Sequence, residues 1–282
     1  MARLNEKAML ATLSISQWRA QKHDKNISEE IAQNHGTTPD VGRYNKFLVD
    51  RQEVKEIAQV ANEARTYHYA HTLPWMDDGC RILTAAMFPE YAAKMQELSG
   101  HFRDSCEKFM QAYPSIVQGA RMKLNGLFRE ADYPPLNRLS RKYGFEVKFM
   151  PMPDKEDFRV KLSEDERAEI MRNIEESANS AVKEAMKELY LRLHEVVLRM
   201  VERLSDSEAV FRDSLVENIT RLCLILPKLN LTNDPKLEEL RKEVEDKLTK
   251  FDPDTLRNDA EARKETAEQA DEILKKLQEV IA

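Results

Sequence analysis

The stretch that decides the fold opens with Gly144-Phe-Glu-Val-Lys-Phe149, where apolar and charged residues alternate as in a strand with one face in water. The alternation returns in Phe158-Arg-Val-Lys-Leu162, after a loop that contains two prolines. We therefore predict a β-hairpin over residues 145–162, with strands at 145–150 and 157–162. Because two strands alone are marginal in water, a third is expected, and residues 10–18 have the required alternation.

A single long helix is predicted to follow the hairpin. Ser163-Glu-Asp-Glu166 has the residues of a capping box, in which the serine and the glutamate each satisfy a free backbone N–H. No proline or glycine follows until Pro227. A helix from Ser163 to Leu204 is roughly 60 Å long at about 1.5 Å per residue. Such a rod has to pack its apolar stripe against other helices or another chain.

Helix signals also dominate the rest of the sequence. Apolar residues recur at coiled-coil spacing over residues 88–109, and Pro114 is expected to separate shorter helices. A further helix, capped by Asp206 or Ser207, is expected to carry Phe211. Asp234-Pro235 and Asp252-Pro253 are typical helix starts. The predicted fold is mainly α, with long antiparallel helices in a coiled-coil-like bundle and a small two- or three-stranded antiparallel β-sheet.

Five segments are predicted along the chain. They are an N-terminal strand with a mobile segment (1–37), a helical region (38–144), the β-hairpin (145–162), the long helix with return helices (163–250) and a C-terminal helix (251–282). Within the second segment, Thr38-Pro39 is expected to start a helix that runs to about His71.

Composition limits the class of protein. Charged residues make up 33% of the 282 residues and there are only 7 glycines, which favours helical bundles over sheet enzymes with glycine-rich turns. Residues 1–162 carry 24 Lys and Arg against 21 Asp and Glu, whereas residues 163–282 carry 20 against 29. The acidic second part would repel nucleic acid, so a DNA contact would have to come from the first.

The cysteines, the N-terminal residues and the apolar runs predict the cellular location. Cys80, Cys106 and Cys223 form no CxxC pair, which fits buried thiols in a reducing compartment. No signal-peptide pattern is visible, and no apolar run is long enough to span a bilayer. We predict a cytoplasmic protein.

The familiar catalytic motifs are missing from the sequence. It has no P-loop, no GxGxxG after a strand, no GxSxG and no HExxH. His68 and His71 share a helical face, but two ligands do not make a metal site, and both are expected to pack as ordinary histidines. We expect no catalytic residues, no metal and no cofactor, and therefore no enzyme.

One segment has the composition of a nucleic-acid interface. Its basic residues are Arg121, Lys123, Arg129, Arg138, Arg141, Lys142 and Lys148. Phe128, Tyr133 and Tyr143 lie between them, so cations could meet phosphates while rings stack on bases. The alternative, which we favour, is that the aromatic residues belong to helix cores and the charges are solvated.

Several stretches resemble an uncharacterised phage and bacterial family, a domain of unknown function. They are Leu13-Ser-Ile-Ser-Gln-Trp18, Tyr143-Gly-Phe-Glu-Val-Lys-Phe149, Phe211-Arg-Asp-Ser-Leu-Val-Glu-Asn218 and Leu226-Pro-Lys-Leu-Asn-Leu-Thr-Asn-Asp-Pro235. The resemblance implies a gene neighbourhood with a MoxR-like AAA+ ATPase and a von Willebrand factor A-domain protein. It implies no catalytic residue.

The helical pattern favours a homo-oligomeric interaction or adaptor protein. The resemblance implies that it is phage-encoded and works with an AAA+ ATPase and its A-domain partner in the host cytoplasm. The residues proposed for partner binding are Phe211, Arg212, Asp213, Glu217 and Asn218. The competing interpretation is that they only pair with neighbouring helices. Two further hypotheses are a DNA-binding or DNA-end-protecting protein that uses residues 121–148, and an inhibitor of a host defence system.

Overall fold

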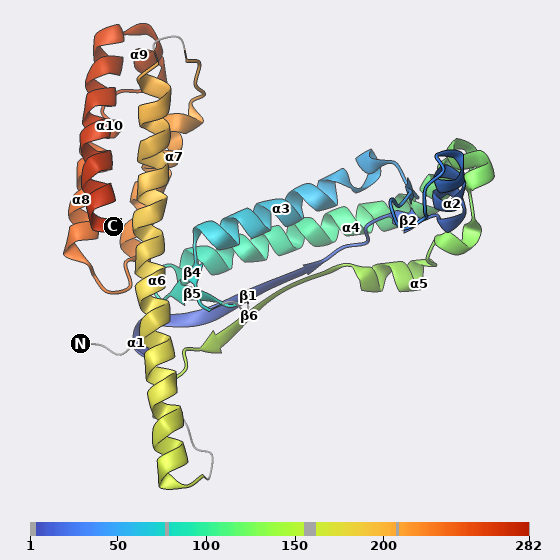
Figure 1. Ribbon diagram of the computed structural model, residues 1–282, viewed down its shortest axis with the longest axis horizontal. Helices are drawn as coiled ribbons and strands as arrows, with labels where there is room; N and C mark the ends of the chain where they lie inside the picture. Colours follow the sequence, from blue (N-terminus) through green and yellow to red (C-terminus); the bar gives the residue numbers. More distant parts are fainter. Residues whose placement is uncertain (1–3, 77–78, 155–161, 207–208, 282) are drawn as a thin grey trace. The chain divides into compact units, whose positions relative to one another are not determined.

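The protein is mainly helical and has a small antiparallel sheet, as the computed structural model in Figure 1 shows. The structure describes residues 4–76, 79–154, 162–206 and 209–281. Strand β6 (Gly144–Pro151) confirms the first strand of the predicted hairpin, and β1 (Ala8–Ser16) confirms the third strand, two residues earlier than expected. The predicted strand at 157–162 lies, apart from Leu162, outside the described residues.

The sheet has the strand order β4-β5-β1-β6 and contains two strands that the sequence did not indicate. These are β4 (Leu73–Pro74) and β5 (Arg81–Thr84). β5 runs antiparallel to β1, with Ala8 opposite Thr84 and Ala11 opposite Arg81. Strands this short have too few positions to show an alternation, so only their pairing in the folded chain reveals them.

A second, two-stranded sheet joins β2 (Gln21–His23) and β3 (Asn45–Phe47). The helix predicted to start at Thr38-Pro39 is therefore wrong. Its helical part begins only with the 3₁₀ turn η1 (Arg51–Val54), which leads into α3 (Lys55–Ala70). Asp50 supplies the N-cap, because its side chain accepts the backbone N–H of Gln52.

The helix α4 (Phe88–Leu124) runs through Pro114, so the expected break there is wrong. A proline inside a helix removes one backbone hydrogen bond. Phe109 and Tyr113, which shortly precede this proline, are 4% and 5% exposed, and their burial favours continuation of the helix.

The long helix is confirmed as α6 (Glu164–Leu204) with its capping box: Ser163 N donates to Glu166 Oε2 at 3.1 Å, and Glu166 N donates to Ser163 Oγ. Its buried stripe begins at Ala181 and runs to Leu204. Along that stripe α6 contacts α7 (Ser214–Leu229), α8 (Pro235–Leu248) and α10 (Ala260–Ile281).

The predicted helix starts at Asp234 and Asp252 are confirmed, because each carboxylate accepts two backbone N–H groups. The expected single C-terminal helix is divided into α9 (Pro253–Asn258) and α10, with Asp259 between them. The remaining short elements are α1 (Leu4–Lys7), α2 (Lys25–Asn34), η2 (Asn125–Leu127), η3 (Glu130–Asp132), α5 (Leu136–Leu139) and η4 (Ser140–Lys142).

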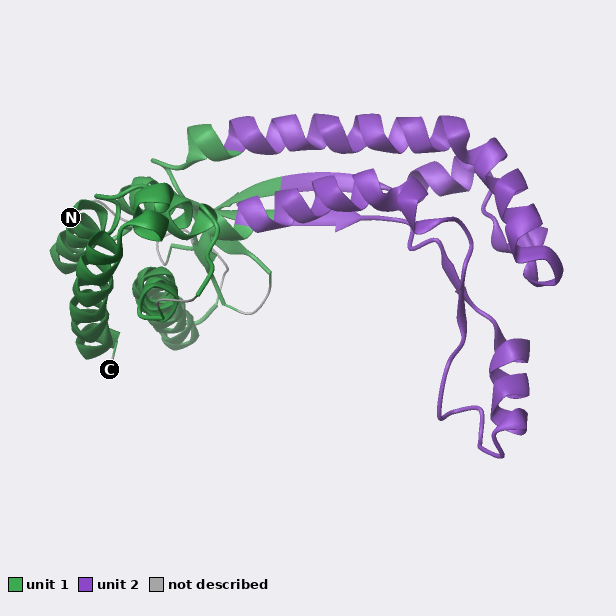
Figure 2. Cartoon of the chain, turned by 90° about the horizontal axis from the view of Figure 1, so that it is seen from above, with its two compact units in different colours: residues 1–12, 69–91, 148–282 green, residues 13–68, 92–147 purple. Residues whose placement is uncertain are grey.

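The chain forms two compact units, coloured separately in Figure 2. Unit 1 comprises residues 1–12, 69–91 and 148–282, and unit 2 comprises residues 13–68 and 92–147. The core of unit 2 contains Ile57, Ala61, Phe102, Cys106, Phe109, Tyr113 and Leu139. Among the described residues, no helix is long and apolar enough to cross a membrane.

Candidate functional site

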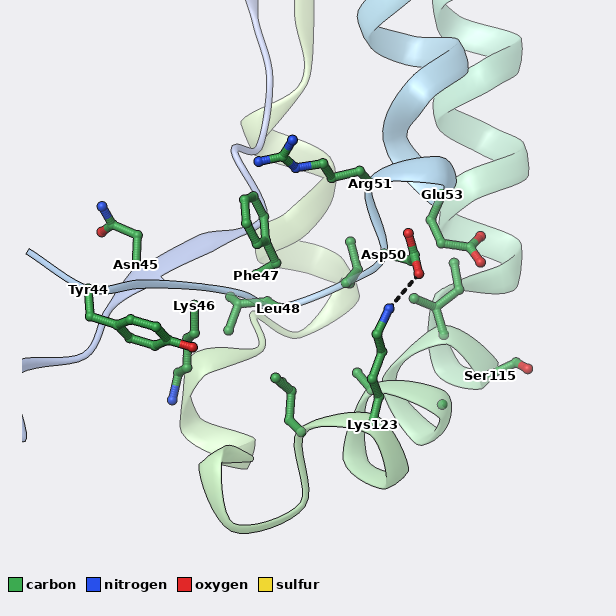
Figure 3. Close-up of a pocket in the computed structure, with 15 residues that line it drawn as sticks. Tyr44, Asn45, Lys46, Phe47, Leu48, Asp50, Arg51, Glu53, Ser115 and Lys123 are labelled. Carbon is green, nitrogen blue, oxygen red and sulfur yellow. Dashed lines mark hydrogen bonds and ion pairs between the residues drawn. The ribbon is translucent and has the colours of Figure 1, made fainter. Parts of the chain in front are cut away.

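A groove in unit 2 is the main candidate site (Figure 3). It encloses about 810 Å³ between two walls, and we call it the β3–α4 groove. One wall is formed by residues 44–51 together with Glu53. The other is one face of α4, formed by Ser115, Ile116, Gly119, Ala120, Lys123 and Leu124. The spacing of these α4 residues follows the helical period, so they share a single side of the helix.

The first wall presents an apolar surface with two exposed rings. Leu48 and Val49 are buried beneath it, at 2% and 4% exposure. Tyr44 and Phe47 remain 36% and 38% exposed. The guanidinium carbon of Arg51 lies 4.3 Å from the centre of the Phe47 ring, which holds that ring by a cation–π contact.

A buried ion cluster fixes this wall from behind. Lys46, in the middle of β3, is only 2% exposed. Its Nζ atom lies 3.1 Å from Asp24 Oδ2 and 2.8 Å from Asp132 Oδ2, and it donates to the carbonyl oxygen of Leu127 at 2.9 Å. The cluster thereby ties β3 to the start of α2, to η2 and to η3.

The ionisation of the cluster follows from these contacts. The hydrogen bond from Lys46 lowers the pKa of Asp24 below its ordinary value, against the opposing effect of burial. Burial alone would lower the pKa of Lys46, but its hydrogen bonds to Asp132 and Asp24 outweigh that effect and raise it. Lys46 and Asp24 are therefore charged at neutral pH, and the cluster is a fixed anchor.

The rim of the groove is polar. Lys123 Nζ, on α4, lies 2.7 Å from Asp50 Oδ2 on the opposite wall. That hydrogen bond lowers the pKa of Asp50. An apolar wall surface with a charged rim suits the binding of a ligand that has both apolar and charged groups.

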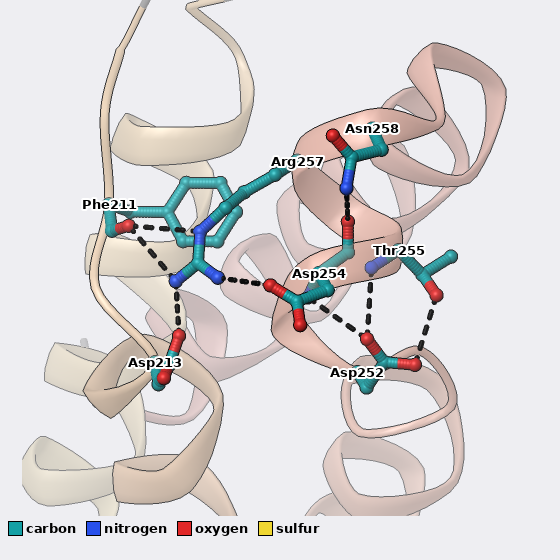
Figure 4. Close-up of polar contacts among 7 residues, drawn as sticks. All are labelled: Phe211, Asp213, Asp252, Asp254, Thr255, Arg257 and Asn258. Carbon is teal, nitrogen blue, oxygen red and sulfur yellow. Dashed lines mark hydrogen bonds and ion pairs between the residues drawn. The ribbon is translucent and has the colours of Figure 1, made fainter.

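The partner-binding residues predicted from the sequence lie in unit 1 and do not form one site. Phe211 is 6% exposed, and the guanidinium groups of Arg257 and Arg263 lie 5.3 and 5.4 Å from its ring centre. Arg257 also binds the Phe211 carbonyl oxygen and the carboxylates of Asp213 and Asp254 (Figure 4). Phe211 and Asp213 are thus engaged within the chain.

The other three predicted residues, Arg212, Glu217 and Asn218, are exposed. Arg212 and Asn218 border one surface hollow, and Glu217 borders a different one. Helix α7 begins only at Ser214, so the expectation that this helix carries Phe211 is wrong.

The basic residues of segment 121–148 lie in different surroundings. Arg121 pairs with Glu130 at 3.3 Å and lies 4.9 Å from the ring centre of Phe128. Lys123 belongs to the groove rim, and Lys148 lies in unit 1. Three residues form an exposed group on α5 and η4, with no ion pair within the part of the chain that the structure describes: Arg138, Arg141 and Lys142.

Two of the six histidines and two of the three cysteines lie in buried positions. His68 and His71 are buried, and no group of three potential metal ligands occurs among the described residues. Cys106 and Cys223 are buried free thiols, as predicted, and Cys80 is half-buried. Burial raises the pKa of Cys106 to about 11 and that of Cys223 to about 12, so both are protonated at neutral pH.

The groove itself was missed by the sequence interpretation. Its walls come from segments far apart in the chain, and the only local signal was the aromatic pair Tyr44 and Phe47 in a run otherwise taken as helix. Comparison of the chain with protein-family models, curated proteins and solved structures gives no significant match.

Proposed function

We propose that the chain is a non-enzymatic interaction protein that binds a segment of a partner protein in the β3–α4 groove. The observation that carries this proposal is the combination of an apolar wall surface, two exposed aromatic side chains and a charged rim around about 810 Å³. Pockets of this kind, between about 300 and 1,000 Å³, hold several side chains or a small ligand. Exposed aromatic residues are also among the side chains most enriched in binding hot spots.

The rigidity of the groove supports the proposal. The anchor of Lys46 holds β3 in place before any ligand arrives, and Asp50 caps η1 on the same wall. A binding surface that is already ordered loses less conformational entropy when a partner binds. Recognition thus belongs to unit 2, and the helices of unit 1 serve assembly, including that of a homo-oligomer.

The resemblance to the phage family suggests which partners to test first. An AAA+ ATPase and a von Willebrand factor A-domain protein, encountered in the host cytoplasm, are the proposed partners. An adaptor role would link the ATPase to its substrate through one flexible segment, which is the kind of ligand that a groove accepts.

A substitution that fills the groove tests the proposal. A Cβ atom at Gly119, on the α4 wall, would meet no atom within 4 Å, so the side chain of Gly119→Leu starts in open space at the groove wall. Leucine is also the better helix former, by roughly 0.8 kcal/mol, so the fold should not suffer. Gly100→Leu is the matched control, because Gly100 lies on α4 outside the groove and is equally unobstructed.

The ligand for this test is a set of peptides selected from a random dodecapeptide display library on the immobilised full chain. By fluorescence anisotropy, Gly119→Leu should weaken their binding at least about tenfold and Gly100→Leu should leave it within about twofold. Equal affinity for both variants, or failure to select any peptide, would refute the proposed function.

Nucleic-acid binding is a second candidate, supported by the exposed group of Arg138, Arg141 and Lys142. The two arginines of this group can each contact one phosphate with two N–H groups, and the lysine adds a third positive charge. Their spacing over one helical turn places all three on the same side of the α5–η4 segment.

The test for this second function is fluorescence polarisation with a labelled double-stranded oligonucleotide. Reversing all three charges should abolish binding, and the affinity of the unmodified protein should fall steeply with salt. Reversal of Lys183, Lys187 and Lys264, exposed lysines of unit 1, is the control. No binding by the unmodified protein at low salt removes this candidate.

A further inference from the structure

The backbone of β3 has one edge that no other described strand covers. β3 pairs antiparallel with β2, with Lys22 opposite Lys46, and the two-stranded sheet ends there. The flanking hydrogen bonds fix which residues face β2: Leu48 N donates to Ala20 O at 2.8 Å, and Asp24 N donates to Tyr44 O at 3.0 Å.

In an antiparallel pair, residues that exchange hydrogen bonds with the partner strand alternate with residues whose backbone groups point away. Tyr44 and Leu48 are both hydrogen-bonded to the β2 side, so Lys46 is as well. The N–H and C=O groups of Asn45 and Phe47 therefore point away from β2. Neither residue has a hydrogen-bond partner for these groups in the described part of the chain.

The two residues that carry this open edge, Asn45 and Phe47, both line the β3–α4 groove. Across the groove lies the α4 face with Ile116, Ala120 and Leu124. Figure 3 shows the extended segment from Tyr44 to Asp50 on one wall and Ser115 and Lys123 on the α4 wall. A groove between an open strand edge and a helix is suited to a peptide in extended conformation.

We propose that the partner segment binds as an additional β-strand on the open edge of β3. This inference rests on the proposed function and names its ligand: an extended peptide with apolar side chains at alternate positions. The backbone groups of Asn45 and Phe47 supply up to four hydrogen bonds to the peptide backbone. Alternate peptide side chains point to one side of the strand, where they pack on the apolar groove wall.

The anchor of Lys46 makes this edge a rigid template. Because its side chain is held by Asp24 and Asp132, β3 cannot twist away from the groove without breaking buried ion pairs. The short length of β3 also limits the ligand, since three residues span only about 10 Å of strand. Recognition therefore depends on a motif of a few residues and tolerates varied flanking sequence.

A proline at the open edge separates strand addition from other modes of binding. Asn45→Pro removes an N–H that faces away from β2, and an edge strand tolerates proline at such a position. Asn45→Ala is the matched control, because it removes the same side chain and keeps the N–H. Circular dichroism and the melting temperature should show that both variants fold.

With peptides selected by display, Asn45→Pro should bind at least about tenfold more weakly than Asn45→Ala. The same peptides N-methylated at the residues that face β3 should lose affinity for the unmodified chain to a similar degree. Equal binding by the two Asn45 variants, with Gly119→Leu still blocking the peptides, would overturn strand addition and leave the groove as the binding site.

Two further outcomes of this experiment bear on different claims, one on the proposed function and one on the identity of the ligand. Peptides insensitive to Gly119→Leu would overturn the proposed function itself, together with the inference that rests on it. If the chain forms dimers that Asn45→Pro dissociates, the occupant of the edge is a second copy and the partner-peptide inference is wrong.

Discussion

Lys46 Nζ lies 3.1 Å from Asp24 Oδ2, and the two side chains are only 2% and 4% exposed. Asp132, 10% exposed, approaches the same ammonium group to 2.8 Å. One cation thus holds together three segments that are far apart in the sequence. Because these segments support the wall of the β3–α4 groove, the cluster links the stability of unit 2 to its proposed binding surface.

Removal of the Lys46 ammonium group should strongly lower the free energy of unfolding. Lys46→Ala leaves two carboxylates without their buried partner, and the loss of one member of a buried ion pair typically costs about 3–5 kcal/mol. The free energy of unfolding in urea measures this cost. Lys22→Ala is the control: its Nζ lies 3.8 Å from Asp132 but the side chain is 56% exposed, so the expected change is below about 1 kcal/mol. Similar losses for the two variants would show that the Lys46 cluster is not an anchor.

The cluster also predicts a dependence of stability on pH. The pKa of Asp24 is lowered in the folded protein, so its contribution is complete above the unfolded-state value of about 4 and is lost as pH falls through the lower folded-state value. The pKa of Lys46 is raised, so its contribution is complete below about 10.4 and is lost as pH rises through the folded-state value.

Urea titrations of the unmodified chain and of Asp24→Asn at several pH values test this dependence. The difference in unfolding free energy between the two proteins should be constant from about pH 5 to 9 and should shrink below about pH 4. A difference that persists unchanged at lower pH would mean that the Asp24 carboxylate does not take part in the ion cluster.

Arg263 is predicted to stabilise the C-terminus of α6. Its guanidinium group donates to the carbonyl oxygens of Arg203, Leu204 and Ala209, at 2.8, 3.2 and 3.0 Å. These carbonyl groups lie at and just beyond the negative end of the helix dipole. Arg263→Ala should cost about 1.5–3 kcal/mol in thermal or urea unfolding, whereas Lys264→Ala, at an exposed neighbour, should change little. Equal effects would exclude this capping role.

Alanine substitutions around Phe211 should affect stability differently at buried and at exposed positions. Phe211 is 6% exposed and contacted by two arginines, so Phe211→Ala should destabilise unit 1 by about 3–5 kcal/mol. Arg212→Ala and Asn218→Ala, at exposed positions, should leave the melting temperature nearly unchanged. If either surface variant nevertheless loses the proposed AAA+ ATPase partner in a pull-down with purified proteins, partner binding lies on unit 1 and not in the groove.

Features encoded by a few adjacent residues could be predicted from the sequence. The capping box of Ser163 and Glu166 and the Asp-Pro start at Asp234 depend on contacts within one helical turn, and both are present. The prediction of a helix break at Pro114 was wrong. The proline removes one helix hydrogen bond, but core packing by distant residues, which no local pattern shows, offsets that loss.

The groove could not be predicted from the sequence, because it depends on contacts between segments that are far apart in the chain. The pairing of β2 with β3 places Lys22 opposite Lys46. The ion cluster of Lys46 also includes Asp132, which comes from another part of the chain. A lysine seen only in its local sequence predicts a solvated side chain, since lysine is almost never fully buried unless it is paired. Only the folded chain shows that Lys46 has its two acidic partners.

Hydrogen exchange of the backbone amides tests the central claim most directly, with and without a peptide selected by display. If the peptide occupies the β3–α4 groove as an added strand, the amides of Asn45 and Phe47 become protected, and protection is lost in Gly119→Leu but not in Gly100→Leu. Unchanged exchange at both amides, with new protection on α5 and η4 or in unit 1, would contradict the claim.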